Sequence, residues 1–216
     1  SGRSYNISVR HGANDWSYYQ DASATIATGW HHLCINWDGS KYEIWLDGSN
    51  VQNGTSGTPS LINCTDFLIG AENYNGTLYY SYNGKIDEVA IFNRALNTTE
   101  IAALYDGTGS NIRPSNLIAS NLNPIAYYPL GEQAQNSGYL SASGNEWQFP
   151  NGVLQDYVMD FDGSNEIQIP SFSLSSEFSI GVWLNADTFV AGSSLIFGYN
   201  ANNSNKIEFN GNSNIL

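Results

Sequence analysis

The acidic residues are the first candidates for chemistry in this sequence of 216 residues. Retaining hydrolysis of a glycoside needs two carboxyl groups about 5–5.5 Å apart. The nearest acidic pair, Asp87-Glu88, is adjacent inside a strand-like run at 85–92, KIDEVAIF. Adjacent residues of a strand point to opposite faces of the sheet. This pair therefore does not have the geometry of two cooperating catalytic acids.

The remaining nucleophiles and metal ligands form no recognisable catalytic pattern. His31 and His32 are neighbours in a strand-like run, so they cannot jointly bind one metal in the usual way. The sequence has no Ser-His-Asp ordering, no glycine-rich phosphate loop and no CxxC, and nothing in it indicates an organic cofactor. Cys34 and Cys64 both lie in strand-like runs, as buried free thiols or as a cross-strand disulfide. We predict that the chain is not an enzyme.

Aromatic residues in polar segments are a stronger indication of binding. The segments 14–21 (NDWSYYQD) and 73–84 (NYNGTLYYSYNG) place Trp and Tyr among Asn and Gly in loop-like sequence. Sugar rings stack on aromatic faces while Asn and Asp side chains bind hydroxyl groups. The alternative is that the tyrosines pack on an outer sheet and the other residues form turns. The candidate ligand-binding residues are Trp16, Tyr18, Tyr19, Tyr74, Tyr79 and Tyr80.

The charge balance limits the partners. With 20 acidic and 7 basic residues the net charge is −13. A phosphate backbone or an anionic membrane would be repelled, and there is no basic stripe. We predict no nucleic-acid partner and no membrane insertion, since no run approaches the ~18 apolar residues of a membrane helix. The acidic surface suits divalent cations and neutral ligands such as sugars.

The elements that must position these residues are short strands. Residues 30–48 (WHHLCINWDGSKYEIWLDG) are the clearest hairpin, because apolar residues alternate on both sides of the turn Asp38-Gly39. Similar strand-like runs occur at 66–70, 85–92 and repeatedly from residue 125 onward. Short strands at regular spacing favour a sandwich or barrel.

One helix is expected, at 97–105. Asn97 is a favourable N-cap, and Glu100 follows at the spacing of a capping box. Leu96 and Ile101 have the spacing of a hydrophobic staple, and Gly107 is placed to end the helix. We expect this helix to pack on the end of the domain.

Several segments together resemble the laminin-G-like jelly rolls of the concanavalin A-like lectin/glucanase superfamily. The resemblance implies an all-β, two-sheet antiparallel jelly-roll sandwich with one short helix. Its most specific part is an Ile-Asp-Glu-Val strand that leads to Arg-Ala-Leu and a short helix. The matching segments are YYPL (127–130), DFDGSNEIQIP (160–170), FSIGVWLNAD (178–187), GWHHLCINWDG (29–39), YEIWLDG (42–48), FLIG (67–70) and GKIDEVAIFNRALNTTEIAALY (84–105).

The resemblance also bears on catalysis and calcium. Glucanases of the laminarinase type carry an E-x-D-x-x-E strand, which does not occur here. Related sandwiches often hold a structural Ca²⁺ beside the closing strand, so Asp87 is a candidate ligand, with Glu132 as a second. The alternatives for Asp87 are an ion pair or cap, for instance with Arg94 or Lys85, or simple exposure. A buried carboxylate needs one of the first two.

The order of the matching segments is inverted relative to the family. Residues 1–107 correspond to the C-terminal half of such a domain and 125–216 to the N-terminal half, with a linker at 108–124. The chain begins SGRSYN, without Met, so we expect either a window from a tandem array or a circular permutant. In both cases the two halves are expected to complement each other in one sandwich.

The resemblance implies a non-catalytic adhesion or carbohydrate-binding module of a repeated extracellular, cell-surface or viral fibre protein. Its partners would be a glycan or protein ligand and neighbouring domains of the same chain. A purely structural spacer is the alternative function, and a glucanase is a third.

Overall fold

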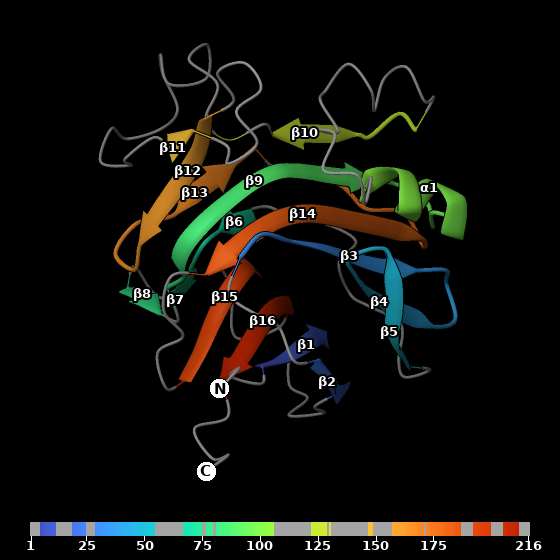
Figure 1. Cartoon of the computed structure of the whole chain (residues 1–216), viewed down its shortest axis with the longest axis horizontal. Helices are drawn as coiled ribbons and strands as arrows, with labels where there is room; N and C mark the ends of the chain where they lie inside the picture. The colour runs from blue at the N-terminus through green and yellow to red at the C-terminus, as the bar shows by residue number, and fades with distance from the viewer. Residues whose placement is uncertain are drawn as a thin grey trace.

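The computed structural model describes the strands and helix of the chain together with the turns between many of them. The described residues are 5–11, 19–24, 29–54, 67–74, 77–79, 81–105, 122–128, 130, 147–148, 157–170, 172–186, 192–199 and 205–211. Within them, the strands form two large antiparallel sheets, one above the other in Figure 1, and a separate two-stranded ribbon. The predicted all-β sandwich with one short helix is confirmed.

The smaller sheet has the strand order β13-β6-β15-β16-β1-β2 among the described residues, and its strands β15, β16, β1 and β2 lie below the larger sheet in Figure 1. The first and last of the described strands, β1 and β16, are hydrogen-bonded neighbours in its middle. Its strands are β1 (Tyr5–His11), β2 (Tyr19–Ala24), β6 (Phe67–Ile69), β13 (Ile167–Ile169), β15 (Gly192–Tyr199) and β16 (Asn205–Gly211).

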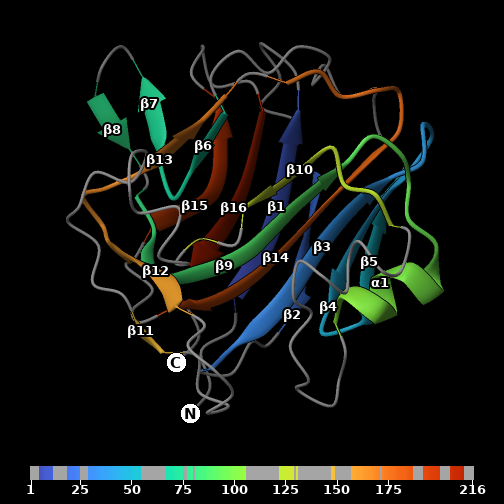
Figure 2. The same cartoon turned by 90° about the horizontal axis from the view of Figure 1, so that it is seen from above.

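The larger sheet has the described order β11-β12-β9-β14-β3-β4-β5, and β10 pairs with β9 beside β12. In Figure 2 the long strands β9, β14 and β3 run side by side across the molecule. Its strands are β3 (His31–Trp37), β4 (Tyr42–Leu46), β5 (Ser49–Gly54), β9 (Asn83–Phe92), β10 (Ala126–Tyr128), β11 (Trp147–Gln148), β12 (Tyr157–Asp162) and β14 (Phe178–Ala186).

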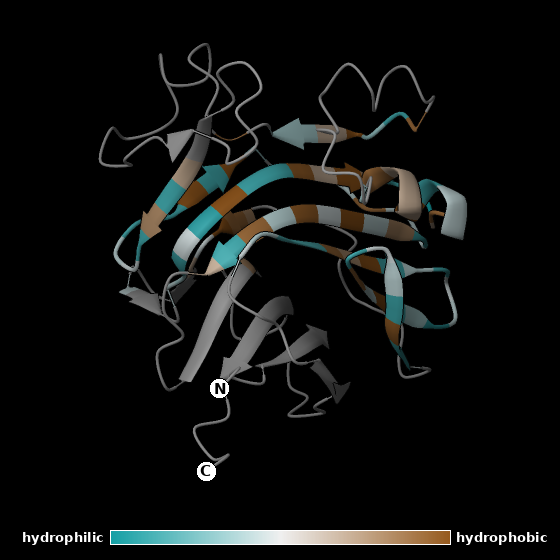
Figure 3. Cartoon of the chain, in the orientation of Figure 1, coloured by the Kyte–Doolittle hydropathy of each residue, from teal (hydrophilic) through white to brown (hydrophobic). Residues whose placement is uncertain are grey.

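The main core lies between the two sheets. Colouring by hydropathy shows apolar and polar residues alternating along β14 and β9 (Figure 3), as expected for strands with one face on the core. The predicted β3–β4 hairpin is confirmed, with Ile35 opposite Ile44 in the register. The inner face of the larger sheet contributes Leu33, Ile35, Ile44, Ile86, Ile91, Ile180, Val182 and Leu184 to this core.

A second apolar cluster covers part of the outer face of the larger sheet. The helix α1 (Thr98–Leu104) has Asn97 as its N-cap, and both hydrogen bonds of the predicted capping box with Glu100 are present. Its buried residues, Ile101 and Leu104, pack on the outer face of the larger sheet, and Figure 1 shows the helix at one end of that sheet. The cluster consists of Cys34, Trp45, Ala90, Phe92, Leu96, Ile101, Leu104 and Leu122, with Tyr127 against it.

The segment 73–84 is not the loop that the sequence suggested. It contains the ribbon strands β7 (Glu72–Tyr74) and β8 (Thr77–Tyr79) and the first residues of β9. The dipeptide Asn75-Gly76 between two strand-forming runs is a strong hairpin signal, and it would have predicted this ribbon.

Strands from the two ends of the chain alternate within both sheets. In the larger sheet β14 lies between β9 and β3, and in the smaller sheet β6 lies between β13 and β15. Each of these inserted strands is hydrogen-bonded on both sides to strands from the other segment. Residues 5–105 and 122–211 thus build one sandwich together.

Candidate functional site

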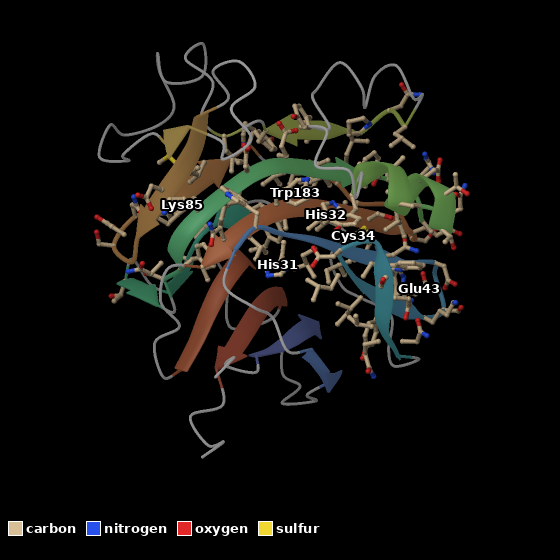
Figure 4. The ribbon with its side chains drawn as sticks, in the orientation of Figure 1. His31, His32, Cys34, Glu43, Lys85 and Trp183 are labelled. Atoms are coloured by element: carbon tan, nitrogen blue, oxygen red, sulfur yellow. The ribbon has the colours of Figure 1, made fainter. Side chains whose placement is uncertain are left out.

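Two regions of the structure carry residue types that could bind a ligand: the outer face of the larger sheet and the β7–β8 ribbon. On the outer face, β3, β14 and β9 present side chains in rows that the register defines. His32, Trp183 and Asp87 are directly opposite one another in one row. Figure 4 shows His32, Cys34 and Trp183 near the middle of this sheet, with Lys85 and Glu43 toward opposite ends.

A β-bulge in β9 sets the position of Asp87. Glu88 has φ of 54°, and the pairing with β14 shifts between Gly181 and Trp183, so that Glu88 and Val89 together oppose one residue. Val89 therefore lies in the main core, while Asp87 lies opposite Trp183 on the outer face. The Asp87 side chain is only 2% exposed.

Arg94, which the sequence suggested as one possible partner of Asp87 beside Lys85, pairs with Glu100 in the structure. Its guanidinium binds the Glu100 carboxylate through two hydrogen bonds of 2.8 and 2.7 Å. This pairing holds the pKa of Glu100 below its usual value. The capping interaction with Asn97 holds Glu100 near Arg94, and Arg94 therefore binds this acid, which is close to it in the sequence.

His32, in the same row as Asp87, belongs to an aromatic cluster. Its ring is 5.4 Å from the Trp183 ring and 6.3 Å from the Tyr105 ring, and Tyr105 stacks on Trp183 at 5.8 Å. Burial lowers the pKa of His32 to about 4, against the opposing influence of Asp47. Among the described residues, its Nδ1 has no hydrogen-bond partner. This histidine is neutral at physiological pH and contributes packing.

Asp47 connects both neighbouring histidines to the β4–β5 turn. Its carboxylate accepts a hydrogen bond from the His32 backbone N–H at 2.9 Å and lies 2.7 Å from Nδ1 of His31. The turn residues Asp47 and Gly48 both have positive φ, as an Asp-Gly hairpin turn requires. The two carboxylate oxygens are thus used to fix the hairpin to β3.

A buried polar network positions the start of the helix. Asn36 and Ser179 are opposite each other in the register, and the Ser179 hydroxyl donates to Oδ1 of Asn36 at 2.5 Å. The Leu96 backbone N–H donates to this same Oδ1 at 2.9 Å, and Nδ2 of Asn36 donates to the Leu96 carbonyl at 3.1 Å. All of these polar groups have a structural role, since they hold the chain that leads into α1.

The described part of the outer face shows no catalytic or metal-binding constellation. No group of three or more His, Cys, Asp or Glu side chains that could hold a metal occurs among the described residues. Cys34 is a buried thiol, and burial together with nearby Glu43 raises its pKa to about 12, which makes it unreactive. Cys64 and Glu132 lie outside the described residues. Asp87 is the carboxylate in this region that remains a candidate calcium ligand.

The β7–β8 ribbon holds two of the predicted sugar-binding residues. Its register pairs Glu72 with Tyr79 and Tyr74 with Thr77, so these four residues occupy one face of the ribbon. Thr77 is exposed. In Figure 2 the ribbon projects at one side of the molecule, beyond β6 and β13.

Among the described candidate residues, Tyr19 lies apart from Tyr74 and Tyr79. Tyr19 is in β2, paired with Val9 at the far edge of the smaller sheet. Four strand spacings separate β2 from β6, which precedes the ribbon, and this corresponds to about 19 Å. Tyr74 and Tyr79 therefore form a region of their own. Trp16, Tyr18 and Tyr80 lie outside the described residues.

The two large antiparallel sheets and the one short helix of the described residues are consistent with a jelly-roll sandwich of the concanavalin A-like fold. Residues 1–102 match the laminin-G-type family model described as the concanavalin A-like lectin/glucanases superfamily. No curated protein and no solved structure gives a significant match to the chain.

At the level of the family, the match supports a carbohydrate-binding or adhesion-type module. Laminin-G-like domains are generally non-enzymatic, generally bind glycans or proteins, and are typically extracellular. In the described part of the chain there is one helix, α1, which has seven residues. No helix among the described residues is long and apolar enough to cross a membrane.

Proposed function

We propose that this chain is a non-catalytic carbohydrate-binding module, and that the face of the β7–β8 ribbon that carries Tyr74 and Tyr79 is its binding surface. The observation that supports the proposal is the register, which pairs Tyr79 with Glu72 and Tyr74 with the exposed Thr77. Tyrosine rings offer faces for stacking with sugar rings, and the carboxylate and hydroxyl groups beside them are hydrogen-bonding partners for sugar hydroxyls. The ligand class is a neutral glycan.

The net charge of −13 supports a neutral ligand over an anionic one. An acidic protein repels sulfated or phosphorylated polymers at a distance, and this repulsion weakens as salt is added. Neutral sugars carry no such penalty. Binding by this surface is therefore expected to depend little on ionic strength, which distinguishes it from binding to an anionic polysaccharide.

A glycan array probed with the whole chain tests this function. We expect saturable binding to a set of neutral glycans that is lost in Tyr74→Ala and in Tyr79→Ala. The matched control is Val51→Ala, which truncates an exposed apolar side chain, 36% exposed, on the distant strand β5. Loss of binding in Val51→Ala as well would point to a general defect. Silence of the wild-type chain across the array would favour the alternative function, a structural spacer.

The proposed binding function also suggests where the protein acts. We propose an adhesion unit of a repeated extracellular, cell-surface or virion-surface protein, with neighbouring domains of the same chain as further partners. The typical extracellular location of laminin-G-like domains supports it. Sequencing of the flanking coding region tests the repeat, because upstream sequence that resembles residues 125–216 is expected.

We also propose a structural Ca²⁺ at Asp87, with Glu132 as the second ligand implied by the family resemblance. Its support is the burial of the Asp87 carboxylate, because a buried charge is costly unless it is hydrogen-bonded, paired or bound to a metal. A metal that binds only the folded state raises the melting temperature. We expect EDTA to lower the melting temperature of the wild-type chain and to leave Asp87→Asn unchanged. An identical melting temperature of the wild type with and without EDTA would rule out this site.

A further inference from the structure

The two segments of the chain depend on each other for strand partners. Segment N (residues 5–105) and segment C (residues 122–211) contribute alternating strands to both sheets. In the larger sheet, β14 of segment C pairs with β9 along one edge and with β3 along the other. In the smaller sheet, β6 of segment N pairs with β13 and with β15, and β1 pairs with β16.

Each segment alone therefore contains a gap that the other segment fills. Removal of β14 leaves β9 and β3 about 10 Å apart, twice the spacing of neighbouring strands, with the facing backbone groups of both unpaired. It also uncovers Leu33 and Ile35 of β3, which are at most 1% exposed in the sandwich. Such a gap is a template for one incoming strand of matching register.

The contacts at the segment ends do not determine whether segment C comes from the same molecule or from a second copy of the chain. Segment N ends at α1 and segment C begins at Leu122, and both ends lie in the same apolar cluster on the outer face. Arg94 joins them, since its guanidinium binds Glu100 of the helix and donates to the Leu122 carbonyl at 3.3 Å. In the described part of the chain, the segments are joined by backbone hydrogen bonds and apolar packing, and a segment C from another molecule presents the same surface.

We propose that segments N and C are reciprocal strand donors, and that the partner for the gap in one molecule is segment C of a second copy of this chain. A reciprocal exchange then closes two complete sandwiches in a two-fold dimer, with β14 of each copy between β9 and β3 of the other. Within one molecule the linker gives a high effective concentration, so closure in cis prevails in dilute solution. Exchange between copies takes over at high protein concentration or where copies are held next to one another.

Complementation between two defective full-length chains tests this directly. Val182→Asp disables β14 of segment C, and Ile35→Asp disables β3 of segment N; both side chains are at most 1% exposed in the core. We expect neither variant alone to show a cooperative thermal transition. After joint refolding, an intact segment N from the first and an intact segment C from the second can form one sandwich. The expected product is a 1:1 heterodimer with one cooperative transition.

The matched control combines two defects in the same strand. Val182→Asp refolded with Ile180→Asp leaves no intact segment C in the mixture, because both substitutions lie in β14. We expect no heterodimer and no cooperative transition from this pair. A control pair that behaves like the complementing pair, or a complementing pair that gives no heterodimer in native mass spectrometry, overturns the proposal.

A second measurement uses the wild-type surfaces and so does not depend on how the variants fold. A specific protease site is inserted into the linker between Gly109 and Ser110, and the folded chain is then cut. We expect both segments to remain together in a 1:1 complex. After a brief denaturant pulse, mixed isotope-labelled and unlabelled complexes should form hybrids in amounts equal to the parental complexes. Segments that separate, or that never form hybrids, contradict reciprocal donation.

Discussion

The buried histidine of the outer face makes the stability of the sandwich depend on pH between about 4 and 6.5. Burial lowers the pKa of His32 from 6.5 to about 4 in the folded chain. The folded state therefore disfavours the proton that the unfolded state binds below pH 6.5. Because the unfolded state binds more protons in this window, the free energy of unfolding falls as the pH falls.

The size of the effect follows from the two pKa values. One pKa unit corresponds to about 1.4 kcal/mol, so the complete shift corresponds to about 3 kcal/mol. Between pH 7 and pH 5 the expected loss is about 2 kcal/mol, roughly a 30-fold change in the unfolding equilibrium constant. The groups that face the imidazole are Trp183, Tyr105 and Asp47, together with Leu104 above Gly181.

Urea unfolding at pH 7, 6 and 5 measures this loss, and His32→Phe removes the titration while retaining a ring against Trp183. We expect the free energy of unfolding of the wild type to fall as the pH falls. For His32→Phe, we expect this free energy to fall by about 2 kcal/mol less between pH 7 and 5. His32→Gln serves as a second non-titrating variant. All other titrating groups are common to the three proteins and cancel in the difference. An equal pH dependence in wild type and both variants would refute the reasoning.

Three further substitutions test how the fold is held, each by urea unfolding at pH 7. Ser179→Ala removes the hydroxyl that donates to Oδ1 of Asn36 and accepts from the Leu96 backbone N–H, so a loss of about 1–3 kcal/mol is expected; no loss would contradict the role of the network. Asn97→Ala removes the N-cap of α1, for an expected loss of about 1 kcal/mol, and unchanged stability would show that tertiary packing alone holds the helix. Gly70→Ala places a methyl group 2.4 Å from the Phe161 ring at φ of 89°, for an expected loss of about 2–4 kcal/mol, and a tolerated alanine would mean that β6 can shift.

Local sequence patterns predicted the elements that are defined by neighbouring residues. The β3–β4 hairpin follows from the alternation that ends in Ile35 and resumes at Ile44, around the Asp38-Gly39 turn. The helix α1 follows from Asn97 and Glu100, whose capping interactions span only three residues. Both predictions are confirmed because all the information they need is local.

The candidate site depended on contacts that no local pattern contains. Cys34 and Phe92 occupy the outer face of the larger sheet, yet both are fully buried because α1 covers them. The capping signals locate this helix along the chain but not the face on which it packs. The bulge at Glu88 likewise lies in the pairing with β14, about 90 residues away, so the simple alternation assumed for Asp87 and Glu88 does not apply at this point of β9.

The placement of Tyr74 and Tyr79 on one face of the ribbon could have been predicted from the sequence. Asn75-Gly76 predicts a hairpin, and a two-residue turn fixes the register that puts both tyrosines on one face. The separation of this ribbon from Tyr19 could not be predicted from the sequence, because it follows from the order of strands in the smaller sheet. The order places segments N and C in alternation, which only long-range pairing can establish.

Saturation-transfer NMR with the whole chain and a panel of neutral sugars tests the proposed binding surface most directly, because it detects sugar protons that lie against protein side chains. We predict transfer to ring protons of at least one sugar in the wild-type chain and in Val51→Ala. The same experiment on the double variant Tyr74→Ala/Tyr79→Ala should show none, with its thermal unfolding transition intact. Transfer of equal strength in the double variant, or none in the wild type, would contradict the assignment of the β7–β8 ribbon as a carbohydrate-binding surface.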